Sequence, residues 1–89
     1  MKATAEISLY PLSEDYKELI IDFILRLKKY EGLKVQVNGM STQIFGEYDD
    51  VMAAITAESR NVFENGKAVL MMKLTGTDQS IENLPEVFK

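Results

Sequence analysis

Residues 3–12 alternate between apolar and polar side chains, which is the period of a β-strand with one buried face. Pro11 predicts the end of this strand, because proline lacks the N–H group that a sheet ladder needs. A strand that is buried on one face so near the N-terminus is expected to lie centrally in its sheet. Its apolar side consists of Ala3, Ala5, Ile7 and Leu9, and its polar side consists of Thr4, Glu6, Ser8 and Tyr10.

Residues 14–31 have the spacing of an amphipathic helix. Ser13 is the expected N-cap, and Glu14 and Asp15 follow in the first turn, where carboxylates interact favourably with the helix dipole. Gly32 is the expected C-cap. The apolar positions that recur at helical spacing are Tyr16, Leu19, Ile20, Phe23, Ile24, Leu27 and Tyr30.

Residues 33–47 predict a β-hairpin. Asn38-Gly39 is the expected turn, because both residue types tolerate positive φ. A longer turn that includes Met40 is the alternative, and the resulting shift of one residue would exchange the two faces of the returning strand. In the predicted register one face carries Thr42, Ile44 and Gly46, and the other carries Ser41, Gln43 and Phe45.

A second helix is expected to begin at Asp49 or Asp50 and to end at Asn65-Gly66 through a left-handed C-cap. Residues 67–75 alternate again and predict the last strand. The inner stripe of this helix is expected to consist of Val51, Met52, Ile55, Ser59, Val62 and Phe63. The last strand is expected to direct Ala68, Leu70, Met72 and Leu74 to one side, and Val69, Met71 and Lys73 to the other.

The order strand, helix, strand, strand, helix, strand predicts an α+β fold of the ferredoxin-like type over residues 1–76. In this βαββαβ fold, a four-stranded antiparallel sheet has both helices on one face. Residues 77–89 predict a loosely attached C-terminal tail with one helical turn at 81–85. The uncovered sheet face would carry an apolar patch of Tyr10, Phe45, Val69 and Met71, which indicates either an interface between copies or a ligand pocket.

Composition limits the functions that are open to this chain. Its 89 residues suffice for one domain, and the absence of cysteine and histidine excludes disulfides, thiolate nucleophiles, histidine-based triads and Cys/His zinc sites. The net charge of −4 argues against nucleic acid as a partner and favours a neutral or cationic ligand. The first residues contain no long apolar run, so we expect no signal peptide and no membrane insertion, and a cytoplasmic location.

No catalytic constellation is apparent, so we expect no enzyme activity and no metal site. The chain has no glycine-rich phosphate loop and no serine beside a base. Glu6 is the only carboxylate inside the first strand, and it has two interpretations. It either forms an ion pair with Lys73 or Lys34 across the sheet, or it faces a cation or a protonated ring nitrogen of a ligand.

Two short motifs resemble those of a known family. Ile7-Ser8-Leu9-Tyr10-Pro11-Leu12, and Met40-Ser41-Thr42 followed by Gly46, are similar to the YkoF-like thiamine/hydroxymethylpyrimidine-binding domain family. The related thiamine-binding MTH-type family shares the Thr-x-x-x-Gly part of the second motif. The similarity extends over residues 3–75, which is the whole predicted fold.

The resemblance implies binding of thiamine or its hydroxymethylpyrimidine moiety without turnover, in thiamine supply or salvage. It also implies a homodimer or homotetramer built through the sheet, with no cofactor apart from the ligand. Ser8, Tyr10, Ser41 and Thr42 match the motif positions, whereas Glu6 and Asn38 are added from the phase of the strands. We expect these six residues to form a ligand-binding site where the first strand ends beside the hairpin.

An aminopyrimidine suits such a site. Hydroxyls of Ser8 and Thr42 and the amide of Asn38 can pair with its polar edge, Glu6 can hold a protonated ring, and Tyr10 or Phe45 can stack on its face. The alternative function is an oligomerisation or regulatory module with no small ligand, in which the polar face is only an interface.

Overall fold

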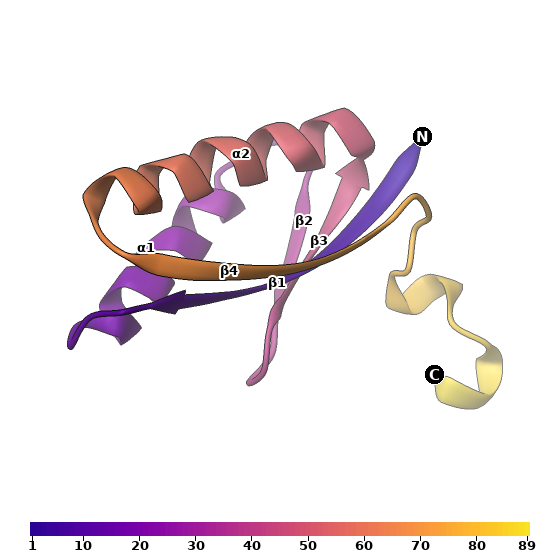
Figure 1. Cartoon of the computed structure of the whole chain (residues 1–89). Helices are drawn as coiled ribbons and strands as arrows, with labels where there is room; N and C mark the ends of the chain where they lie inside the picture. Colours follow the sequence, from indigo (N-terminus) through magenta and orange to yellow (C-terminus); the bar gives the residue numbers. More distant parts are fainter.

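The computed structural model of the chain describes residues 1–89 (Figure 1). The sheet order is β2-β3-β1-β4 with antiparallel neighbours, so β1 lies centrally, as predicted. The strands are β1 (Lys2–Pro11), β2 (Lys34–Val37), β3 (Thr42–Glu47) and β4 (Ala68–Thr75). The helices are α1 (Tyr16–Lys28) and α2 (Tyr48–Asn65), and two 3-10 turns follow, η1 (Ile81–Asn83) and η2 (Glu86–Phe88).

Both helices cover one face of the sheet, and the ferredoxin-like α+β prediction is confirmed (Figure 1). The predicted apolar side of β1 is buried, because its odd-numbered residues point at the helices. The core consists of Ala5, Ile7 and Leu9 from β1, Phe23 and Leu27 from α1, Ile44 from β3, and Val51, Ala54 and Ile55 from α2.

The ends of α1 differ from the prediction. Its N-cap is Asp15, and the Ser13 hydroxyl, which was expected to cap the helix, instead donates a hydrogen bond to the Asp15 carboxylate. The helix ends at Lys28 with Lys29 as the C-cap. Gly32 lies three residues farther on at a φ of 83°, where its missing Cβ permits the left-handed backbone that leads into β2.

Helix α2 begins directly after β3, with Glu47 as the N-cap, so the prediction of a cap at Asp49 or Asp50 is wrong. Both aspartates lie in the first turn, where they still interact favourably with the helix dipole. Gly66 has a φ of 165°, which is extended, so the helix does not end through a left-handed cap. Phe63 is half-exposed, not part of the inner stripe, which is a further correction.

The two helices are joined by a carboxylate, Glu58, that the hydrophobic periodicity of the chain does not indicate. Glu58 of α2 accepts a 2.7 Å hydrogen bond from Nε of Arg26 and another of 2.7 Å from the Tyr30 hydroxyl. The hydrogen bond to this carboxylate raises the pKa of Tyr30, because it stabilises the protonated phenol. This pair of charge-assisted bonds fixes the end of α1 against the middle of α2.

The hairpin turn contains Met40, which is the longer of the two predicted alternatives. Val37 pairs with Thr42, and the backbone N–H of Asn38 donates to the Ser41 carbonyl at 3.0 Å. The Asn38 side-chain oxygen accepts the N–H groups of Met40 and Ser41 at 2.8 and 2.9 Å. A turn that is closed by an asparagine side chain in this way needs no residue at positive φ, and neither Asn38 nor Gly39 adopts one.

The C-terminal segment folds back on the open face of the sheet, although a loosely attached tail was predicted. The buried Thr4 hydroxyl donates to the Thr77 carbonyl and accepts the N–H of Gln79, both at 2.8 Å. Lys34 forms a 3.2 Å ion pair with Glu82. Phe45 is buried at this end of the sheet, so it is not part of the exposed apolar patch in which it was expected.

Candidate functional site

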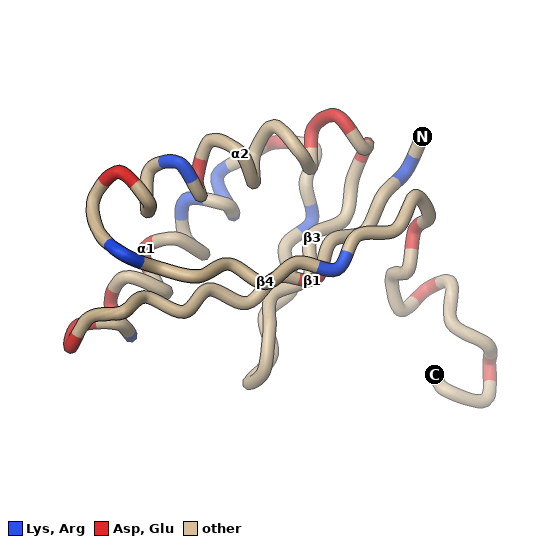
Figure 2. The backbone as a smooth tube through the Cα atoms, in the orientation of Figure 1, with Lys and Arg blue, Asp and Glu red and all other residues tan.

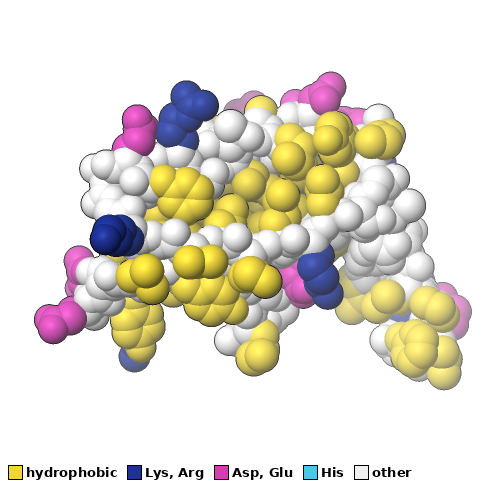
Figure 3. Space-filling model, in the orientation of Figure 1, with side chains coloured by type: hydrophobic (Ala, Val, Ile, Leu, Met, Phe, Trp, Pro, Cys, Tyr) yellow, Lys and Arg dark blue, Asp and Glu magenta, His cyan; other side chains and the backbone are white.

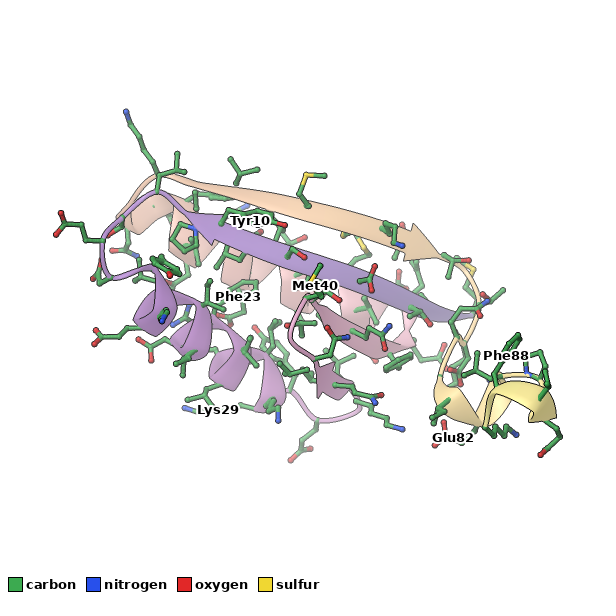
Figure 4. The ribbon with its side chains drawn as sticks, turned by 90° about the horizontal axis from the view of Figure 1, so that it is seen from below. Tyr10, Phe23, Lys29, Met40, Glu82 and Phe88 are labelled. Atoms are coloured by element: carbon green, nitrogen blue, oxygen red, sulfur yellow. The ribbon has the colours of Figure 1, made fainter.

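A cavity of about 400 Å³ lies beside the C-terminal half of β1. It exists because β3 pairs with β1 only as far as the Ile7–Thr42 pair, whereas β1 continues to Pro11 with β4 on its other side. The hairpin turn closes one side of the gap, and the N-terminal half of α1 closes another. Figure 4 shows these three walls through Tyr10 on β1, Met40 at the hairpin tip and Phe23 on α1.

Most of the lining is apolar, with a few polar groups at the hairpin and on β1. This composition and volume are typical of small-molecule pockets, which measure roughly 300–1,000 Å³. The apolar and aromatic lining includes Ile7, Leu9, Tyr10, Pro11, Tyr16, Ile20, Phe23, Ile24, Val37 and Met40. The polar lining consists of Ser8, Asn38, Ser41 and Thr42, with Gly39 between them in the chain.

Five of the six predicted site residues therefore line one cavity. Ser8 donates a 3.3 Å hydrogen bond to the Met40 carbonyl, which joins β1 to the hairpin tip. The Asn38 oxygen is used by the turn, so its NH₂ group is the part that remains for a ligand. Thr42 is buried, and its hydroxyl has no partner within the chain but is reached from the cavity.

The backbone of β1 contributes polar groups that no side-chain pattern indicates. Residues of a strand direct their N–H and C=O groups alternately to its two neighbours. The N–H of Leu12 donates to the carbonyl of Lys67, on the β4 side of β1. The carbonyl of Met1 accepts from the N–H of Tyr48, on the β3 side. The N–H and C=O of Leu9 consequently point to the β3 side, beyond the end of β3 and into the cavity wall.

Glu6 is the predicted site residue that the cavity does not include. It lies on the open face beside Gln43 and Thr75, where Lys73 Nζ is 3.1 Å from one carboxylate oxygen. The Ser41 hydroxyl donates to the other oxygen at 3.0 Å. Hydrogen bonds from Lys73 and Ser41 hold the pKa of Glu6 below its usual value of 4.5, so the ion-pair interpretation describes this carboxylate.

The α1 wall of the cavity was missed at the sequence level. Tyr16, Ile20 and Ile24 were assigned to the buried stripe of a helix, and Phe23 does belong to the core. The periodicity that identifies such a stripe is the same whether the stripe contacts a sheet or a cavity. The gap itself results from the unequal lengths of β1 and β3, which become apparent only with the pairing register.

The structure shows no group of three or more acidic side chains placed to hold a metal ion. Neither helix combines the length and hydrophobicity of a membrane-spanning segment.

Solved structures with the same fold are found in bacteria and archaea. A hypothetical protein of Methanocaldococcus jannaschii is 28% identical, with a TM-score of 0.75, and the match covers 91% of this chain and 89% of that one. A candidate thiamine biosynthesis/salvage protein of Thermotoga maritima is 22% identical, with a TM-score of 0.83 and complete coverage of both chains. A Streptococcus pneumoniae protein is 20% identical, with a TM-score of 0.82 and the same coverage.

No curated protein matches the chain at a significant level. The model of one protein family, however, matches residues 2–77, which include every strand, both helices and both motifs. The chain therefore belongs to the YKOF-related family.

Proposed function

We propose that this protein binds thiamine or its hydroxymethylpyrimidine moiety without turnover, in thiamine supply or salvage in the cytoplasm. The observation that carries the proposal is the cavity beside β1, where residues 7–11 of the first motif meet residues 40–42 of the second. Membership of the YKOF-related family supports it, as does the likeness to the Thermotoga protein with a candidate role in thiamine biosynthesis or salvage.

The polar groups of the cavity suit an aminopyrimidine edge. Such a ring presents acceptor nitrogens and an exocyclic amine donor. The Thr42 hydroxyl and the Asn38 NH₂ can donate to ring nitrogens, and the Leu9 carbonyl can accept from the amine. Tyr16 and Tyr10, both partly exposed at the cavity, offer aromatic faces for stacking.

The charge of the protein agrees with a cationic ligand. The net charge of −4 creates a potential that attracts the thiazolium ring of thiamine. Acidic residues, Glu14, Asp15 and Glu18, lie at the start of α1 (Figure 2). Side chains of the same helix line the cavity. An anionic phosphate ester has no such advantage, so we expect thiamine to bind more tightly than its phosphates.

A second candidate function is an association module without a small ligand. The exposed side chains of Tyr10, Val69 and Met71 favour it, because they form an apolar patch on the open sheet face. The two functions are compatible, and we propose that the protein assembles through its sheet as a homodimer or homotetramer.

Thermal denaturation with thiamine, hydroxymethylpyrimidine and thiamine phosphates tests the proposed ligand. A ligand at a hundred times its Kd stabilises the folded state by about 2.7 kcal/mol, and calorimetry then gives the stoichiometry. Mass spectrometry of the recovered ligand is expected to show it unchanged. If none of these compounds alters the melting temperature, the association module without a ligand is the better description.

A further inference from the structure

Met40 has the most exposed large apolar side chain of the protein, with an exposed fraction of 88%. Figure 4 shows it at the tip of the hairpin, beside β1. In Figure 3 this tip, at the bottom of the view, stands apart from the larger groups of hydrophobic side chains over α2 and β4. A single exposed apolar side chain is common on protein surfaces and indicates no function by itself. Met40 differs because it also lines the cavity, so it lies at the cavity rim.

The main chain of Met40 is held on both sides, which leaves the side chain as the part that can move. Its N–H donates to the Asn38 side-chain oxygen at 2.8 Å, and its carbonyl accepts from the Ser8 hydroxyl at 3.3 Å. A methionine side chain is unbranched and turns about three bonds, so it adapts to the shape of a neighbouring group. The hairpin therefore presents an adaptable apolar side chain on a fixed base at the rim.

We infer that Met40 covers the ligand in the cavity and is a site of reversible oxidation that controls ligand release. The inference rests on the proposed function and adds the regulation of the same site. A ring that is bound among the apolar side chains of the cavity gives the thioether a partner that the chain itself does not supply, because sulfur packs favourably against aromatic rings.

The oxidant is hydrogen peroxide, and the reaction needs no other reagent. The Met40 sulfur attacks one peroxide oxygen, so an S–O bond forms as the O–O bond breaks. The hydroxide that leaves takes the proton from the transferred oxygen and becomes water. Sulfur is oxidised by two electrons and peroxide is reduced. The sulfoxide is polar and turns to water instead of the apolar cavity, and a methionine sulfoxide reductase restores the thioether.

The other four methionines do not line the cavity. Met1 precedes β1, Met52 lies on α2, and Met71 and Met72 lie on β4. Their oxidation is not expected to change the cavity rim. Met71 has an exposed fraction of 59% and is the internal control for a methionine that peroxide reaches but the ligand does not cover.

The rate of oxidation with and without ligand tests whether Met40 covers the cavity. The protein is treated with hydrogen peroxide, digested with trypsin and followed by mass spectrometry. Met40 and Met52 share the tryptic peptide 35–60, and fragmentation of this peptide separates them. Saturating thiamine should slow the oxidation of Met40 by about threefold or more and leave that of Met71 unchanged. Equal rates for Met40 with and without bound thiamine overturn the inference.

Calorimetry with thiamine tests whether oxidation releases the ligand. After peroxide treatment and removal of the peroxide, the affinity of the unaltered protein should fall about two- to tenfold, and the reductase should restore it. Met40→Leu keeps an apolar side chain without sulfur, so its affinity should not respond to peroxide. Met71→Leu is the matched control and should respond like the unaltered protein.

The outcomes separate this inference from the proposed function. If the untreated protein binds thiamine and its affinity is the same after oxidation of Met40, only the present inference is overturned. An equal loss of affinity in oxidised Met40→Leu overturns the assignment to Met40. If the untreated protein does not bind thiamine at all, the proposed function fails, and this inference fails with it.

Discussion

The Ser41 hydroxyl donates a 3.0 Å hydrogen bond to Glu6, whose other carboxylate oxygen is held by Lys73 at 3.1 Å. One carboxylate therefore connects β4, β1 and the hairpin turn, and the turn is a wall of the cavity. Glu6 itself lies outside the cavity. We propose that it is a positioning residue, because it can affect a ligand in the cavity only by holding Ser41 and the turn in place.

Glu6→Ala is accordingly expected to weaken ligand binding without removing a ligand contact. The loss of one hydrogen bond to the turn should lower affinity about three- to tenfold. The decisive readout is the pH profile, since the affinity of the unaltered protein should fall when Glu6 is protonated below pH 4.5, and the variant should lack this component. Glu82→Ala removes an ion-paired carboxylate far from the cavity and should leave affinity unchanged. Identical pH profiles for Glu6→Ala and the unaltered protein would contradict a positioning role.

Stability is expected to fall at acid pH. Hydrogen bonds from Lys73 and Ser41 lower the pKa of Glu6 below 4.5. Hydrogen bonds from the N-terminal amine and Lys2 lower the pKa of Glu47 in the same way. A carboxylate whose pKa is lower in the folded state binds protons more readily in the unfolded state. Its contribution to the stability of the fold is therefore present above about pH 4.5 and is lost as the pH falls below this value. The melting temperature should therefore be level between pH 5.5 and 8 and decline below about 4.5. A melting temperature that stays level down to pH 3 would show that these ion pairs do not stabilise the fold.

The alternation of residues in β1 and β4 was sufficient to predict which side chains face the helices, because a period of two requires only local sequence. The burial of Phe45 could not be predicted in this way. It goes with the return of the C-terminal segment to the sheet, where Thr4 binds residues 77 and 79 and residues 78–83 lie around Phe45, far from it in the chain. Helix ends were also missed, because a cap such as Asp15 depends on backbone geometry that residue preferences describe only on average.

The candidate site was predictable in position but not in composition. The end of β1 and the hairpin could be placed together from the fold alone, and five of the predicted residues do meet there. The role of Glu6 could be predicted only with the strand register known, since its partner Ser41 is thirty-five positions away. The exposure of the Leu9 backbone could be predicted only from the fact that β1 extends beyond the end of β3.

Gly46, the glycine of the Thr-x-x-x-Gly motif, has a packing role. A Cβ at this position would lie 2.6 Å from a methyl group of Leu33 and 3.0 Å from the Gly32 carbonyl oxygen. Gly46→Ala should lower the free energy of unfolding by about 1–3 kcal/mol through overpacking, as measured by urea denaturation. Gly66→Ala is the matched control, because nothing lies within 4 Å of its Cβ position and its backbone is extended. Equal stabilities of the two variants would show that Leu33 moves aside without cost.

Thr42→Val is the sharpest test of the cavity as the binding site. Valine has the shape of threonine and suits a β-strand, so the buried position in β3 should keep its packing. The variant loses a hydroxyl that has no partner in the chain and is therefore available to a ligand. A ligand nitrogen left without its hydrogen bond in this cavity should lower affinity about ten- to a hundredfold, as measured by calorimetry with thiamine.

Thr56→Val supplies the control for this substitution, because Thr56 is exposed on the outer face of α2, away from the cavity. It should bind thiamine like the unaltered protein. The melting temperatures of both variants without ligand distinguish a loss of binding from a loss of fold. If Thr42→Val binds with unchanged affinity while its fold is intact, the hydroxyl does not contact the ligand. If Ser8→Ala and Tyr10→Phe also bind thiamine with unchanged affinity, the thiamine site lies outside this cavity. The three residues line it from different strands, so a ligand inside it would contact at least one of them.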